Sequence, residues 1–86
     1  MSFQAMEWAL SANVNDASER LILLMLANHA DADGIASPGH TRLAADCLMT
    51  PRTVTDKIGS LCRAGTVAKI NEYSGSGRVA YQLNIL

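Results

Sequence analysis

SPGHTRLAADCLMTPRTVTDKIGSLCRA, residues 37–64, contains two helix-start signals that lie thirteen residues apart. Ser37-Pro38 and Thr50-Pro51 each place a hydroxyl side chain directly before a proline. The hydroxyl can accept a hydrogen bond from a free amide at the start of a helix, and a proline in the first helical position has no amide to leave unpaired. We therefore expect a short helix that includes residues 43–45, a turn at residues 47–49, and a longer helix that begins at the second proline.

The longer helix has two faces of different chemistry. Its apolar side chains follow the i, i+4, i+7, i+8 spacing of a face that enters a core, and they are Val54, Ile58, Leu61 and Cys62. The opposite face gathers polar side chains, which are Arg52, Asp56, Ser60 and Arg63, with Thr53 and Lys57 beside them. Gly65 is expected to end the helix. Two helices joined by a tight turn form the layout of a helix-turn-helix, whose second helix fits the major groove of DNA.

The residues before this motif predict one further helix and a stub of strand. Asp16 and Glu19 have the spacing of a helix-capping box, with aspartate in place of the usual serine or threonine. The apolar stretch that follows predicts a largely buried helix over residues 17–30. Gly34 can take the left-handed conformation that ends such a segment, and residues 35–36 are long enough only for a short strand.

The residues after the motif predict a β-hairpin. Strands are expected over residues 66–71 and 78–85, and the segment rich in glycine and serine between them is typical of a hairpin tip. The second strand alternates, with Val79, Tyr81, Leu83 and Ile85 on one face. The order of elements predicts a single winged helix-turn-helix domain over residues 1–86. This fold is α+β and mainly helical, with a three-helix core and a C-terminal hairpin wing.

Composition and charge are those of a small folded domain. The 86 residues are 49% hydrophobic and 17% charged, which argues against disorder and leaves room for one modest core. The net charge of -1 is unevenly spread, because residues 1–38 carry one arginine against five carboxylates, whereas residues 39–86 carry six lysines and arginines against three. The second part would attract a polyanion. We expect a cytoplasmic protein with reduced thiols at Cys47 and Cys62, since a signal peptide, a membrane-length apolar run and CxxC spacing are all missing from the sequence.

Several short motifs resemble the winged helix-turn-helix domains at the N-terminus of phage and plasmid replication initiator proteins. The matching positions are Asp33-Gly34, Ser37-Pro38, Leu43-Ala44, Arg52-Thr53-Val54, Leu61 and Gly65. The resemblance covers residues 2 to about 84. It implies sequence-specific binding of double-stranded DNA in a bacterial host cell, for replication initiation or, as the nearest variant, transcription regulation. Replication proteins are then candidate partners, and the chain is a candidate N-terminal domain of a longer initiator.

The first group of candidate DNA contacts lies on the polar face of the longer helix. Arg52 is expected to pair with guanine N7 and O6, and Thr53 to touch a thymine methyl group or a phosphate. Asp56 would either accept a hydrogen bond from a cytosine amino group or orient Arg52. Lys57, Ser60 and Arg63 complete the face, and the last of these is placed to meet the DNA backbone. The alternative for the whole group is a solvated helix surface.

Two further groups lie outside this helix. His40, Thr41 and Arg42 fall in the first turn of the shorter helix, where free amides, a hydroxyl and a guanidinium could hold one phosphate. Ser76 at the hairpin tip and Arg78 at its base could contact phosphate or the minor groove, with Lys69 on the other strand in the same patch. Plain surface positions are the alternative in both cases.

Other classes of function find little support in the sequence. The histidines, cysteines and the Asp-Ala-Asp-Gly segment match no zinc or calcium spacing, and catalytic motifs are missing, so we expect neither a metal, a cofactor nor an enzyme. Phe3, Met6 and Trp8 are expected in the core or in a homodimer interface. The alternative function is a winged-helix protein-protein interaction module without strong DNA binding, which net acidity and Asp56 favour.

Overall fold

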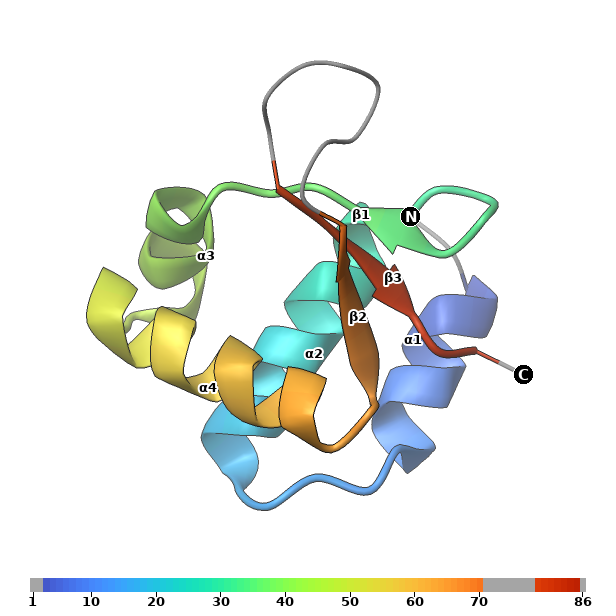
Figure 1. Ribbon diagram of the computed structural model, residues 1–86, viewed down its shortest axis with the longest axis horizontal. Helices are drawn as coiled ribbons and strands as arrows, with labels where there is room; N and C mark the ends of the chain where they lie inside the picture. The colour runs from blue at the N-terminus through green and yellow to red at the C-terminus, as the bar shows by residue number, and fades with distance from the viewer. Residues whose placement is uncertain (1–2, 71–78, 86) are drawn as a thin grey trace.

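The computed structural model describes residues 3–70 and 79–85. In this part of the chain, four helices and three strands follow one another (Figure 1): α1 Phe3–Ser11, α2 Ala17–His29, β1 Ile35–Ala36, α3 His40–Cys47, α4 Pro51–Arg63, β2 Val67–Ile70 and β3 Ala80–Leu83. The order β1-β3-β2 makes a small antiparallel sheet. This arrangement confirms the predicted winged helix-turn-helix architecture, with α1 added to the expected three-helix core.

Helix α2 forms as its capping sequence predicts. The carboxylate of Asp16 accepts a hydrogen bond from the amide of Glu19 at 2.9 Å, which satisfies one of the free donors of the first turn. The reciprocal bond of the capping box is displaced by one residue, because the Glu19 carboxylate accepts from the amide of Asn15 at 3.4 Å. Gly34 takes the left-handed conformation, with φ of +77°, and leads the chain into β1.

The helix start predicted at Ser37 is wrong. Helix α3 begins at His40 behind Gly39, which has no side chain to cap it. Ser37 instead donates its hydroxyl to the carbonyl of Val79 at 3.4 Å, because residues 37–39 continue the extended path of β1 beside the start of β3. The second start is confirmed, since the Thr50 hydroxyl accepts from the amide of Thr53 at 3.1 Å.

The turn between α3 and α4 lies where it was expected. Leu48 turns the chain with a left-handed backbone, φ 56° and ψ 47°, and its side chain is 94% exposed. Its amide and that of Met49 donate to carbonyls in the last turn of α3, so the turn is closed by backbone hydrogen bonds. In Figure 1, α3 and α4 lie together at one end of the molecule.

Helix α1 was not expected from the sequence, and small side chains attach it. Ala5 and Ala9 are fully buried, and α1 packs along α2. The Nη1 atom of Arg20 donates to the carbonyls of Ala9, Leu10 and Ala12 at 2.6–2.8 Å, which ties the end of α1 to α2. Of the aromatic and sulfur-containing side chains predicted to be core or interface, Met6 and Trp8 pack partly against the core, whereas Phe3 is 85% exposed.

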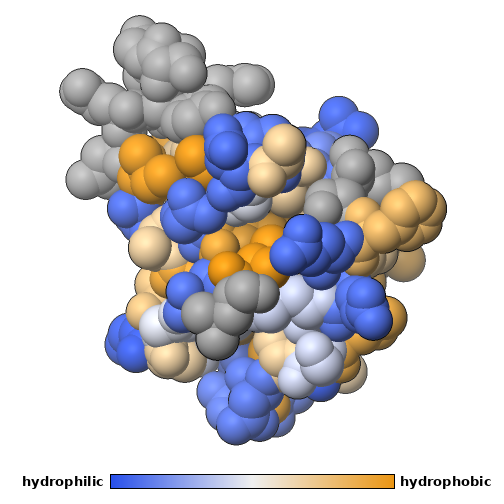
Figure 2. Space-filling view, turned by 90° about the vertical axis from the view of Figure 1, so that its right-hand side faces the viewer, coloured by the Kyte–Doolittle hydropathy of each residue, from blue (hydrophilic) through white to orange (hydrophobic). Residues whose placement is uncertain are grey.

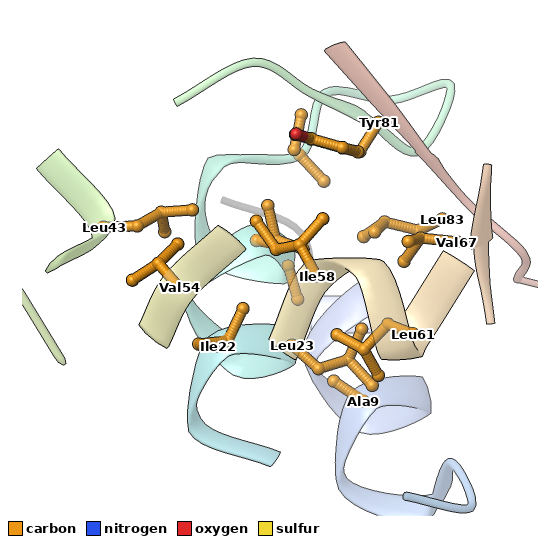
Figure 3. Packing of buried hydrophobic residues seen from close by; sticks show 14 of the residues in the cluster. Ala9, Ile22, Leu23, Leu43, Val54, Ile58, Leu61, Val67, Tyr81 and Leu83 are labelled. Carbon is orange, nitrogen blue, oxygen red and sulfur yellow. The ribbon is translucent and has the colours of Figure 1, made fainter. Parts of the chain in front are cut away.

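The apolar face of α4 fills the centre of the molecule. Val54, Ile58 and Leu61 point toward α2, α3 and the sheet in Figure 3, as their spacing predicted, and Cys62 is partly buried. Both cysteines are free thiols. Leu83 pairs with Val67 across the hairpin, and Tyr81 pairs with Lys69. Within the described residues, β2 begins at Val67 instead of residue 66, and β3 ends at Leu83 instead of residue 85. The expected tip, residues 72–77, lies outside the described residues.

Gly59 and Gly65 are expected to respond to alanine in opposite ways. Gly59 lies inside α4, where an added Cβ would meet only the Nη1 atom of Arg63, at 3.4 Å. Gly59→Ala should therefore raise the free energy of unfolding by about 0.5–1 kcal/mol and the Tm by about 2–8 °C in thermal unfolding. Gly65 has φ of +79°, so Gly65→Ala should lower the free energy of unfolding by about 1–2 kcal/mol. A shift of both variants in the same direction would contradict this account.

Candidate nucleic-acid interface

The outward stripe of α4 carries three charged side chains. Arg52, Asp56 and Arg63 are exposed and lie on the side of the helix opposite its buried face. Thr53 is half-buried, and its hydroxyl is 2.9 Å from that of the Thr50 cap. The structure therefore brings together three of the four charged residues that the sequence proposed for this surface, with one arginine in the first turn and one in the last.

One flank of α4 is bound to the start of α2. The Lys57 ammonium donates to the Asp16 carboxylate at 2.7 Å, and this hydrogen bond lowers the pKa of Asp16 and raises that of Lys57. Ser60 donates at 3.1 Å to Glu19, a buried carboxylate that is 4% exposed. The predicted DNA contacts Lys57 and Ser60 are thus engaged within the protein, unlike their neighbours on the outward stripe.

The other flank of α4 is bound to α3 and the sheet. The Nδ1 atom of His40 lies 3.0 Å from the hydroxyl of Thr55 in α4, and its Nε2 atom lies 2.7 Å from the hydroxyl of Tyr81 in β3. The two rings are stacked with their centroids 6.1 Å apart. Burial, with a smaller contribution from the charge of Lys69, lowers the pKa of His40, and burial raises the pKa of Tyr81. Both ring nitrogens of His40 therefore have partners inside the fold.

The remaining predicted contacts differ in their surroundings. Thr41 and Arg42 are exposed in the first turn of α3, and Arg42 pairs with Asp46 one helical turn later at 3.2 Å. An exposed pair of this kind stabilises a helix only slightly, so the guanidinium is free to change partners. Ser76 and Arg78 lie outside the described residues.

A cleft separates the first turn of α3 from the base of the hairpin. It has a volume of about 340 Å³, and it is lined by Ser37, Pro38, Gly39, His40, Lys69, Val79 and Tyr81. Lys69 is exposed, and it lies on the same face of the sheet as its cross-strand neighbour Tyr81. The cleft thus places a cation next to the His40 ring, between two of the predicted contact groups.

The face of the molecule on the α1 side has a mixed surface. Figure 2 shows hydrophilic and hydrophobic side chains interspersed over this face, which lies at the opposite end from α3 and α4 in Figure 1.

Within residues 3–70 and 79–85, none of the helices combines the length and the apolar character that crossing a membrane would require.

Comparison with known families identifies the central part of the chain. The model of a helix-turn-helix domain family matches residues 17–67, which span α2, β1, α3, α4 and the first residue of β2. Comparison with curated proteins and with solved structures gave no significant match.

The lowered pKa of His40 predicts a specific dependence of stability on pH. In the unfolded chain the imidazole takes up a proton near pH 6.5, whereas in the folded chain it does so at lower pH. The unfolded state therefore binds more protons in this window, and the free energy of unfolding should fall as the pH drops below about 6.5.

Urea unfolding of the wild type and His40→Gln between about pH 5 and pH 7.5 measures this contribution. The variant keeps every other titratable group, so its free energy of unfolding should change less over the same range. Parallel curves for the two proteins would show that His40 does not titrate as the structure indicates.

Proposed function

The chain belongs to the helix-turn-helix domain family, and on that premise we propose that it binds double-stranded DNA sequence-specifically, with α4 as recognition helix and the β2-β3 hairpin as wing. The observation that carries the proposal is the exposed stripe of α4, which holds Arg52, Asp56 and Arg63 on a helix fixed along both flanks. A helix held in this way presents its charged side chains in a fixed orientation to a groove.

The roles within the stripe follow from position. Early residues of a recognition helix reach base edges, so Arg52 in the first turn is assigned to guanine, which a guanidinium reads through N7 and O6. Asp56 lies one turn further and orients Arg52 or accepts from a cytosine amino group. Arg63 in the last turn meets phosphate. Thr41, Arg42 and Lys69 supply further backbone contacts beside the helix, and Ser76 and Arg78 are kept as wing contacts.

We place the DNA binding in replication initiation of a phage or plasmid, with transcription regulation as the nearest variant. The resemblance of the Asp33-Gly34, Leu43-Ala44 and Arg52-Thr53-Val54 motifs to replication initiator domains supports this assignment. Selection of bound duplexes from a random pool would give the recognised sequence, and dyad symmetry in it would indicate binding as a dimer. A pool without enrichment, together with no salt-dependent DNA binding, would favour a protein-protein interaction module instead.

Replacement of the two arginines of α4 should separate base reading from phosphate contact. Arg52→Ala should weaken binding to the selected duplex by roughly 1–3 kcal/mol and relax the preference at one base pair. Arg63→Ala should weaken binding to all duplexes alike and reduce the slope of log affinity against log salt by about one. Competition binding with single-base variants of the site measures both effects. Unchanged selectivity in Arg52→Ala would exclude Arg52 as a base reader.

The Lys57–Asp16 pair should limit the DNA affinity of the free protein. Asp16→Asn keeps a good N-cap for α2 but removes the charged partner of Lys57. The variant should bind duplex DNA more tightly, with a salt slope steeper by about one, because the released ammonium gains a phosphate contact.

Glu7→Gln on α1 is the matched control, because it removes the same unit of negative charge from an exposed position outside α4. It should leave the salt slope unchanged. An equal effect of the two substitutions would mean that only the net charge of the protein matters.

A further inference from the structure

We propose that His40 is a positioning residue that sets the orientation of α4 against β3, and thereby the sequence discrimination of the domain, without contacting DNA itself. The proposal rests on the DNA binding proposed above. It assigns to His40 a role different from the phosphate contact that its place in the first turn of α3 first indicated.

The protons of the three side chains can be assigned from their partners. The Thr55 hydroxyl donates to the carbonyl of Pro51 at 3.0 Å, so its single proton is used. Its oxygen can therefore only accept from His40, which requires a proton on Nδ1. A neutral imidazole then leaves Nε2 as an acceptor, and the Tyr81 hydroxyl donates to it at 2.7 Å. The result is one series of hydrogen bonds with a single direction of donation. Tyr81 donates to His40, His40 donates to Thr55, and Thr55 donates to the carbonyl of the first residue of α4.

The series of hydrogen bonds ends at the carbonyl of Pro51, directly before the proposed base reader Arg52. Pro51 is the first residue of α4 and Arg52 the second, and Thr55 lies one turn later on the side that faces His40. A shift of Thr55 relative to β3 therefore moves the turn that carries Arg52. Because β3 is also one strand of the hairpin, the His40 ring links the recognition helix to the wing strand.

The groups around the His40 ring favour the neutral imidazole that this series of hydrogen bonds requires. Lys69 of β2 approaches from the cleft, Tyr81 of β3 is buried, and Thr55 of α4 is uncharged. Burial and the Lys69 ammonium lower the pKa of His40, which keeps the imidazole neutral at pH 7. A neutral ring with both nitrogens engaged is a poor ligand for phosphate and a good spacer between two hydroxyls.

The test measures the ratio of dissociation constants for a scrambled duplex and for the duplex selected by the wild type. Thr55→Val and Tyr81→Phe each remove one hydroxyl of the chain with little change in shape. Each should reduce the ratio by about three- to tenfold, which is the range expected for one hydrogen bond. Affinity for the scrambled duplex should stay near that of the wild type. Thr66→Val is the matched control, because Thr66 is not a member of this series of hydrogen bonds. It should leave the ratio unchanged.

Two substitutions at His40 distinguish its two bonds. In His40→Asn the side-chain amide nitrogen takes the place of Nδ1 and can still donate to Thr55, whereas in His40→Gln the terminal amide takes the place of Nε2. His40→Asn should keep more of the discrimination than His40→Gln, although both lose one partner. Thermal unfolding monitored by circular dichroism confirms that each variant is folded.

Three results would overturn the proposal. Equal weakening on both duplexes would indicate a phosphate contact, and an unchanged ratio with only a lower Tm would indicate a purely structural role. Identical behaviour of His40→Asn and His40→Gln would remove the link to α4. Failure of the DNA-binding proposal is seen separately, because the wild type would then select no duplex at all.

Discussion

Helix α4 packs its apolar face against α2, α3 and β2 at once, and this packing fixes where its polar residues lie. With Val54, Ile58 and Leu61 in the core, rotation of the helix about its axis would expose apolar surface or bury charge, and both are unfavourable. The two sides next to the buried face then meet polar partners, which are Asp16 and Glu19 at the start of α2 and His40 of α3. What remains outward is a narrow charged stripe. The proposed DNA surface is therefore a consequence of how the core is filled.

The local features of this fold could be predicted from the sequence because they depend on neighbouring residues. The Thr50-Pro51 cap, the apolar spacing of α4 and the turns at Gly34 and Gly65 all act within one or two helical turns. The same reasoning failed at Ser37-Pro38, where a good local capping signal was overridden by the extended path beside β3. Helix α1 escaped prediction because its buried face consists of alanines, which give a weak apolar pattern.

The candidate site was only partly predictable, since its decisive contacts connect distant parts of the chain. Lys57 and Asp16 are 41 positions apart, as are His40 and Tyr81, and nothing in the local sequence marks either pair. The uneven distribution of charge along the sequence also did not show where the acidic residues lie relative to α4. The acidic first part of the chain does not lie only on the side away from α4, because Asp16 and Glu19 contact the flank of that helix and neutralise part of its charge within the protein.

The turn between α3 and α4 depends little on the side chain of Leu48, the residue with the left-handed backbone. A leucine in the left-handed region costs about 1–2 kcal/mol, and a side chain that is 94% exposed regains almost nothing by packing. Turns of this kind often contain glycine, which avoids that cost. The angle between α3 and α4 is thus imposed by the interior contacts of both helices, and the connecting residue adapts to it. A glycine at this position would remove the strain of the left-handed backbone without disturbing the contacts that set this angle.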